Sequence, residues 1–240
     1  MAQELQDIMT PVQSGDMLYA LAFAWINLFN EQPKKESLVL LLSHISLECG
    51  INFSGGCHCY NYGNIKYSQK FKSDYVYFKC NELMPIDEAK RLVGSSDKDG
   101  GQATITGVRP DNMAWIWFYP KNPGCKFAAF NSKEDGALFY LSFLKQRYSK
   151  APAVWQAVLD ANPDAYIHNL KLNGYFTVDE NIYKASVIRL YKQFINLEYD
   201  PDKLPAVSDT QKEAIQNLIG LTMDETSDDM ILDTTDSDQT

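Results

Sequence analysis

The sequence has no run of about 18 uncharged apolar residues, the length that a membrane-spanning helix needs. Its most apolar early stretch, residues 17–29, contains the polar Asn27 and follows a leader with acidic residues but no lysine or arginine. A secretory signal begins with a basic segment and ends at a small-residue cleavage site, and neither is visible here. We therefore expect no membrane span and no signal peptide, and we expect the chain to be made in the cytoplasm.

Basic residues are also few, since 22 Lys and Arg stand against 31 Asp and Glu, for a net charge of -9. Seven of the acids lie in residues 224–238, where there is no basic residue, so the rest of the chain has 24 acids and 22 bases. A protein that binds nucleic acid presents a basic face, and this composition argues against that class. Low hydrophobicity and like charge predict disorder for the last twenty residues.

Five cysteines are an odd number, so they cannot all pair within the chain. Cys57, His58 and Cys59 have the side chains of metal ligands, but a zinc site usually takes cysteines that are two to four residues apart. The sequence therefore predicts no metal site. Cys80 and Cys125 flank the region that we expect to be a sheet, so its chain ends could bring them together. Thiols and a disulfide are both open there.

Apolar residues at three- and four-residue spacing predict helices along much of the chain. The expected helices cover residues 16–30, 36–49, 85–93, 132–148, 152–161, 162–174, 177–197 and 210–221. Asp16 is expected to cap the first helix, and Gly50 to end the second. Ser132 and Thr177 each precede an acidic residue by three positions, which is the spacing of a capping box. Asn162 before a proline is typical of a helix start.

Alternating apolar residues predict strands at 73–83, 102–108 and 113–119, whereas residues 51–66 have the composition of a loop. The last of these strands is rich in aromatic residues: Trp115, Trp117, Phe118 and Tyr119. They could form the core and rim of the sheet, or one of them could line a groove. The order of helices, a small antiparallel sheet and helices again predicts an α+β fold. We expect one domain with one core over residues 1–200, and a C-terminal extension over 201–240 that is disordered from about 224.

One carboxylate stands out among the residues that could carry chemistry. Glu48 ends the apolar segment LVLLLSHISLECG, directly before a glycine-rich loop. Burial disfavours the charged form of a carboxyl, which suits a general acid that works near neutral pH. The alternative is a glutamate at a helix end that turns into solvent. His44, one helical turn earlier, could contact Glu48 or serve only the structure of the helix.

The segments around Glu48 also resemble a known family. SLECG and the following YNYGNIKYS, residues 60–68, are similar to the glutamate and the Asn/Gly/Ile/Lys loop of bacterial peptidoglycan glucosaminidases, a branch of the lysozyme-like superfamily. KFAAFNSKEDGALFYLSFL and GYFTVDENIYKASVIRLY resemble two later segments of that family, in the same order. The resemblance extends over about residues 38–194.

This resemblance implies a lysozyme-like fold, with a mainly helical body, a small antiparallel β-lobe and a groove for a glycan strand between them. It implies that Glu48 is the general acid, which protonates the glycosidic oxygen. It further implies a glycan-binding role on the two sides of the groove for Asn61, Tyr62, Asn64, Lys66, Tyr175 and Tyr183. No cofactor and no metal are implied.

Glycoside hydrolysis usually takes a second carboxylate, about 5–10 Å from the first. Asp74 and Glu82 lie at the ends of the strand expected at 73–83, and either could reach the groove or be a solvated acid at a strand end. Without a second acid, the acetamido group or a hydroxyl of the sugar would supply the nucleophile. The hydroxyl route is the chemistry of a lytic transglycosylase.

The resemblance therefore implies a hydrolase of the N-acetylglucosamine/N-acetylmuramic acid backbone, whose partner is the peptidoglycan glycan strand. Because no signal peptide is visible, we expect delivery by a phage particle or a secretion machine, and action at the bacterial cell wall or in the periplasm. The alternatives are a structural or adaptor protein of a phage tail, with little or no activity, and a glycan-binding module without turnover. The cleaved bond, the second catalytic group and the host stay open.

Overall fold

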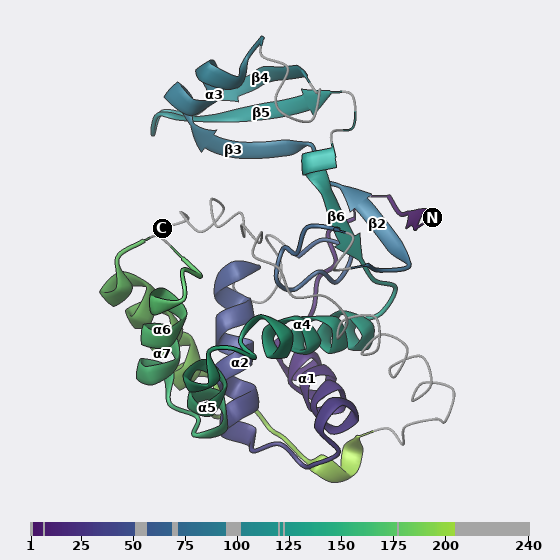
Figure 1. The fold of residues 1–240 in the computed structure, drawn as a ribbon, viewed down its shortest axis with the longest axis vertical. Helices are drawn as coiled ribbons and strands as arrows, with labels where there is room; N and C mark the ends of the chain where they lie inside the picture. Colours follow the sequence, from purple (N-terminus) through teal and green to yellow (C-terminus); the bar gives the residue numbers. More distant parts are fainter. Residues whose placement is uncertain are drawn as a thin grey trace.

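The computed structural model describes residues 2–6, 8–50, 57–68, 72–94, 102–119, 121, 123–176 and 178–204, and Figure 1 shows its elements. Six helices make up a helical body: α1 (Ser14–Phe29), α2 (Lys35–Glu48), α4 (Lys133–Arg147), α5 (Pro152–Leu159), α6 (Pro163–Leu172) and α7 (Glu180–Phe194). In Figure 1, α2 stands between α1 and α4 on one side and α5, α6 and α7 on the other. The molecule is thus mainly helical, with small sheets, as an α+β fold requires.

Helix α2 is the centre of this body, and its sequence explains why. Its residues 37–46, which read SLVLLLSHIS, are all buried, and a helix that is apolar on every side is stable only inside a core. The other helices surround it: α7 packs against α2, and α1 packs against both α2 and α4. The apolar residues of the two helical parts, before and after the sheets, accordingly form one large cluster.

The helix ends test the capping predictions. Ser132 accepts a hydrogen bond from the Asp135 backbone N–H at 3.1 Å, as predicted for the start of α4. Asn162 accepts one from Ala165 N–H at 3.0 Å at the start of α6, and Gly50 after α2 has a left-handed φ of 84°. These positions depend on neighbours within three residues, so their local sequence was sufficient to predict them.

Two predicted caps are wrong. Helix α1 begins at Ser14, so Asp16 lies inside its first turn, where it forms an ion pair with Lys133 at 3.6 Å. Asp179 caps α7, because its carboxylate accepts hydrogen bonds from the backbone N–H groups of residues 181 and 182. The capping box at residue 177 therefore places the start of this helix too early, and Thr177 itself lies outside the described residues.

The single strand predicted at 73–83 is also wrong, since the structure has two strands there, in different sheets. Strand β2 (Tyr75–Phe78) pairs antiparallel with β6 (Lys126–Ala129) and parallel with β1 (Gln3–Glu4). Strand β3 (Asn81–Pro85) belongs to the other sheet. Lys79 and Cys80 carry the chain from one sheet to the next, and an alternating sequence gives no sign of such a change of partner.

The second sheet is the antiparallel one that the sequence predicts. Its order is β3-β5-β4, with β5 (Met113–Tyr119) in the centre, β4 (Gln102–Val108) at one edge and a β-bulge between Ile105 and Gly107. Helix α3 (Ile86–Leu92) packs against this sheet. We call β3, α3, β4 and β5 the sheet lobe. In Figure 1 it lies beyond β2 and β6, at the end of the molecule opposite the lower turns of α1 and α5.

The sheet lobe has a small core of its own, which corrects the expectation of a single core. Its buried residues are Cys80, Met84, Ala89, Ala103, Ala114, Ile116, Phe118 and Cys125. A third, smaller cluster lies between β2, β6 and the segment around Cys59. An inserted sheet whose two chain ends are close together can bury its apolar face against its own helix, so it needs little of the main core.

The neck of the sheet lobe brings Cys80 and Cys125 together, as predicted. The backbone N–H of Lys79 donates to the Cys125 carbonyl at 2.9 Å, and the Cys80 thiol lies near that of Cys125. Burial raises the pKa of the Cys125 thiol, and both side chains are thiols here.

No helix of the described ranges combines the length and the apolar character that crossing a membrane requires. The 3₁₀ turn η3 (Pro201–Lys203) is the last element before residue 204. The helix predicted at 210–221 and the acidic end of the chain lie outside the described residues.

Candidate functional site

Glu48 is the last residue of α2, and its side chain keeps 12% of its surface exposed. The hydroxyl of Tyr183, from α7, donates a hydrogen bond to Glu48 Oε1. The same oxygen lies 3.7 Å from Nε2 of His44, one helical turn earlier on α2. The carboxyl is thus held by a hydrogen bond from the helix that packs against α2, and it faces an imidazole of its own helix.

His44 has no exposed surface and connects Glu48 to further hydroxyl groups. Its Nδ1 lies 2.8 Å from the hydroxyl of Tyr166 and 3.1 Å from that of Tyr140. The ring of Tyr175 meets the imidazole edge to face, with 4.8 Å between the ring centroids. A hydroxyl that donates to Nδ1 requires the ring hydrogen to be on Nε2, the nitrogen that faces Glu48.

Five tyrosines surround this pair, and we call them the tyrosine cluster: Tyr140, Tyr148, Tyr166, Tyr175 and Tyr183. None is more than 4% exposed. Burial raises the pKa of each phenol, and the nearby charge of Glu48 raises it further. For Tyr148 the pKa rises to about 12, although the guanidinium of Arg147 acts in the opposite direction. At neutral pH the cluster therefore surrounds the carboxyl with uncharged hydroxyl groups.

The loop after α2 contributes Asn64, whose side-chain amide donates to the backbone carbonyl of Glu48 at 3.5 Å. Asn61 holds this loop in place, because its buried amide donates to the carbonyls of Ile65 and Ala128, both at 3.0 Å, and its oxygen accepts from Ile65 N–H at 2.9 Å. The ring of Tyr62 is buried as well. Asn61 and Tyr62 therefore contact protein groups, and they position the loop that carries Asn64.

Gly136, in the first turn of α4, allows this loop to approach the helix. A Cβ at this position would lie 2.2 Å from the backbone oxygen of Tyr60 and 2.9 Å from the ring of Tyr62. A real Cβ never comes so close to a backbone atom, so only glycine fits here without a shift of the backbone. The packing of α4 against the loop therefore depends on the absence of a side chain.

The structure brings together some of the predicted site residues and separates others. Glu48, Asn64, Tyr175 and Tyr183 come from three distant parts of the chain and meet at the end of α2. Lys66 lies elsewhere, bridged to Phe127 of β6, with its Nζ 5.9 Å from the centre of that ring.

The two candidates for a second carboxylate belong to the two sheets. Asp74 is exposed just before β2, where its backbone carbonyl accepts from Gln3 N–H at 2.8 Å. Glu82 is on β3, opposite Ile116, and close enough to Cys125 to raise the pKa of its thiol. The groups described above around Glu48 include neither of them.

Three members of the site are ones that the sequence did not indicate: Tyr140, Tyr148 and Tyr166. Tyr140 and Tyr166 occupy helical positions that could equally be core, Tyr148 directly follows α4, and their convergence on α2 needs three helices to meet. The one available signal was that Tyr140 lies in a segment that resembles the glucosaminidases. His44 was a candidate contact of Glu48. In the structure its Nε2 faces Glu48, and its Nδ1 lies beside the hydroxyl of Tyr166.

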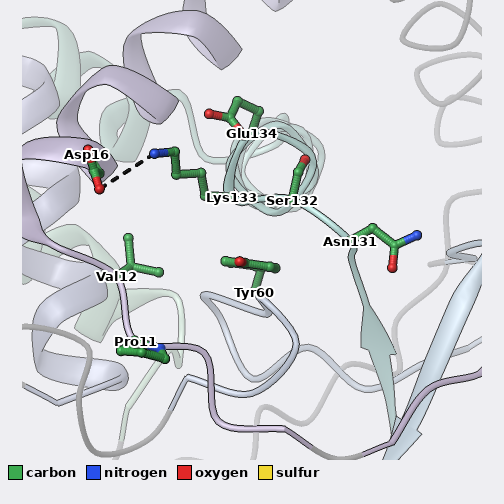
Figure 2. A pocket seen from close by; sticks show the side chains of 8 residues that line it. All are labelled: Pro11, Val12, Asp16, Tyr60, Asn131, Ser132, Lys133 and Glu134. Carbon is green, nitrogen blue, oxygen red and sulfur yellow. Dashed lines mark ion pairs between the residues drawn. The ribbon is translucent and has the colours of Figure 1, made fainter.

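No group of three metal-ligating side chains occurs in the ranges that the structure describes. A polar pocket of about 310 Å³ lies at the start of α4, away from these contacts, and is lined by Pro11, Val12, Asp16, Tyr60, Asn131, Ser132, Lys133 and Glu134. Figure 2 shows Asp16 and Lys133 directed toward each other across it, with the ring of Tyr60 below. Their ion pair neutralises the one basic side chain of this lining, and Glu134 adds a further carboxylate.

No protein-family model, no curated protein and no solved structure matches this chain. The chemistry of the site must therefore be argued from its own residues. What they offer is one partly exposed carboxyl, held by a hydroxyl and facing an imidazole among uncharged phenols. Such a group can accept or give a single proton at a defined position.

Proposed function

We propose that this protein is a peptidoglycan hydrolase with a lysozyme-like fold, and that Glu48 is its general acid. Two independent features support the proposal. The sequence around Glu48 resembles the glucosaminidases in SLECG and YNYGNIKYS, and the fold combines a mainly helical body with a small antiparallel sheet. The substrate is then the N-acetylglucosamine/N-acetylmuramic acid backbone of the cell wall.

The observation that carries the proposal is the environment of the Glu48 carboxyl. Its Oε1 is held by Tyr183 and faces His44, so the side chain has a fixed orientation at the end of a rigid helix. It remains 12% exposed, whereas His44 and the tyrosine cluster behind it are buried. A catalytic acid needs this combination of a fixed position and access from one side.

In the proposed reaction, Glu48 gives a proton from its other oxygen, Oε2, to the glycosidic oxygen as the bond to the sugar C1 breaks. The positive charge that develops on C1 and the ring oxygen is then quenched by a nucleophile, and Glu48 takes a proton back from it. Direct attack by water gives hydrolysis, and so does attack by the acetamido oxygen of the sugar once water has opened the oxazoline that it forms; a hydroxyl of the same sugar gives an anhydro end. Asp74 and Glu82 are the candidates for a second acid in the first route.

The proposed site of action is the bacterial cell wall or the periplasm, after delivery by a phage particle or a secretion machine. Peptidoglycan strands are the partner that this activity requires. Proteins of the phage tail or of the secretion machine would be the carriers.

The test compares Glu48→Gln with the parent protein on purified peptidoglycan, in a zymogram and a turbidity assay. General acid catalysis contributes about 10²- to 10⁴-fold, so activity should fall at least about 100-fold. The melting temperature should stay level or rise, because the amide oxygen still accepts from Tyr183 and an amide costs less to bury. Glu36→Gln is the matched control, since Glu36 is exposed at the other end of the same helix. Mass spectrometry of the released muropeptides identifies the cleaved bond and any anhydro end.

One observation favours a second candidate, a structural or adaptor protein of a phage tail that keeps this body without turnover. Tyr175 and Tyr183 are almost fully buried, so in this conformation they offer little surface for a sugar ring to stack on. If the parent protein lyses no peptidoglycan, the structural role is the better explanation. Full activity of Glu48→Gln would instead show that the catalytic assignment is wrong.

A further inference from the structure

The sheet lobe presents a row of aromatic rings to solvent on its central strand. Along β5 the buried residues Ala114, Ile116 and Phe118 alternate with exposed ones. Trp115, Trp117 and Tyr119 are 38%, 43% and 68% exposed. Because every second residue of a strand is on the same face, the three side chains share one face of the sheet, about 6–7 Å apart along the strand.

The strand register shows which side chains flank this row. Trp117 pairs with Asn81 of β3 on one side and Thr104 of β4 on the other, and Tyr119 pairs with Gln102. Trp115 is opposite Leu83 and Gly107. The residues beside Trp117 and Tyr119 thus carry amide and hydroxyl groups, those beside Trp115 are apolar, and none of them is charged. We call Trp115, Trp117, Tyr119, Asn81, Gln102 and Thr104 together the aromatic face.

The aromatic face is on the side of the sheet that does not enclose the lobe's core. The opposite face of the same sheet packs on α3 and encloses the lobe's own core, so the tryptophans are free of that task. Most of the surface of a tryptophan side chain is usually buried. Exposed aromatic residues that gather on one face therefore mark a binding surface. Tryptophan and tyrosine have only two side-chain torsions, and the strand fixes the backbone beneath them, so three such rings lose little entropy when they bind a ligand.

We propose that the aromatic face binds an uncharged stretch of a glycan chain, made of N-acetylhexosamine rings. The C–H faces of pyranose rings stack on Trp115, Trp117 and Tyr119, as apolar surfaces do on aromatic rings. The amide and hydroxyl groups of Asn81, Gln102 and Thr104 exchange hydrogen bonds with the sugar hydroxyl and acetamido groups. The inference goes beyond the proposed function, because binding at this face does not use Glu48.

The chemistry of the face favours a glycan over other partners. A nucleic acid or an anionic membrane would call for lysine or arginine beside the rings, and the flanking register positions hold neither. A charged peptide would call for an opposite charge at the same positions. The complementary partner is neutral and rich in hydroxyl groups, with flat apolar faces, and a chain of acetylated sugars has this character.

The test measures binding of the full chain to insoluble chitin and to purified peptidoglycan by sedimentation. It is carried out in the Glu48→Gln background, so that a failure of binding is seen separately from a failure of catalysis, which is scored in the parent. Trp117→Ala should weaken binding at least about tenfold. Tyr119→Ala should weaken it less steeply, and it provides a second variant at the most exposed ring if Trp117→Ala unfolds the lobe.

Val108→Ala is the matched control, because Val108 is also exposed, at 60%, but its register partner Ala114 is on the other face of the sheet. Its binding should equal that of the parent. Unchanged binding of both Trp117→Ala and Tyr119→Ala would overturn the proposal. So would analytical ultracentrifugation that shows a dimer of the parent which Trp117→Ala dissociates, since the face would then join two copies of this chain.

Discussion

The helical body and the sheet lobe bury their apolar residues in different ways. In the body, ten consecutive residues of α2 are buried and the other helices share one core around them. In the lobe, a three-stranded sheet and one short helix enclose eight buried residues, while two tryptophans of the central strand stay exposed. Stability is therefore concentrated in the body, which also holds Glu48, whereas the lobe can devote one whole face to a partner.

The largest effect is expected in the centre of the body. Leu41→Ala in α2 should lower the free energy of unfolding by about 3–5 kcal/mol, because a fully enclosed site cannot collapse around the missing atoms. Urea denaturation followed by circular dichroism measures this. Leu172→Ala, at an exposed position of α6, should change it by less than about 0.5 kcal/mol. A loss below 1 kcal/mol for Leu41→Ala would contradict the idea of a central helix.

The next effect concerns the neck of the lobe. Refolding with oxidised glutathione should join Cys80 and Cys125 in a disulfide, with two glutathione thiols released for each bond. Closing the chain around the lobe should stabilise it by about 2–4 kcal/mol. Hydrogen exchange should then slow in β3, β4 and β5 more than in α2, and peptide mapping identifies the bond. Cys125→Ser removes the bond and should remove the shift; a shift that persists would mean that another pair had reacted.

The third effect tests how tightly the helical body is packed around Gly136. Gly136→Ala should lower the free energy of unfolding by about 1–3 kcal/mol, because the new Cβ meets the backbone of Tyr60. Gly15→Ala in α1 is the control, since a Cβ there meets nothing within 4 Å and alanine favours the helix. Thermal unfolding of the two variants should move in opposite directions. Equal midpoints would mean that the loop after α2 can retreat from α4.

The smallest effect is the share of one tyrosine of the body in the pH dependence of stability. The folded state holds the protons of the tyrosine cluster to a higher pH than the unfolded chain, whose phenols have a pKa of about 10. Above that pH the unfolded state binds fewer protons, so stability falls as the pH rises, by about 1.4 kcal/mol per pH unit for each tyrosine that stays protonated. Ultraviolet titration of the phenols and melting curves between pH 8 and 11 measure this. Tyr148→Phe should make the fall shallower, and an unchanged slope would mean that Tyr148 gives up its proton as readily in the folded state as in the unfolded chain.

Local signals predicted those parts of the fold that depend on local neighbours. The bounds of β4 and β5 agree with the alternating pattern, and Ser132 and Asn162 cap the helices predicted for them. The split of residues 73–83 between two sheets depends on which strand each half meets, and β1 contributes only two residues to its pairing. The alternating pattern of residues 73–83 indicates neither the change of sheet nor the pairing with β1.

The site shows the same division. Glu48 was recognisable because an acid at the end of an apolar helix conflicts with its surroundings, and the resemblance placed Asn64, Tyr175 and Tyr183 near it. Tyr140, Tyr148 and Tyr166 conflict with nothing in their own segments of the sequence. Their contribution becomes visible only where α4 and α6 meet α2, since a tyrosine hydroxyl needs a partner that is about 100 residues away.

The neck of the sheet lobe has one more consequence, for how such a chain can change. The two stems that enter and leave the lobe are one hydrogen bond apart, from Lys79 N–H to the Cys125 carbonyl, and β2 and β6 continue as a pair below them. A turn of a few residues could join them in place of everything between. Insertions are tolerated best where the two ends of the added segment lie together. The lobe is in this sense an interchangeable attachment, and its aromatic face can vary without any change in the helices that hold Glu48.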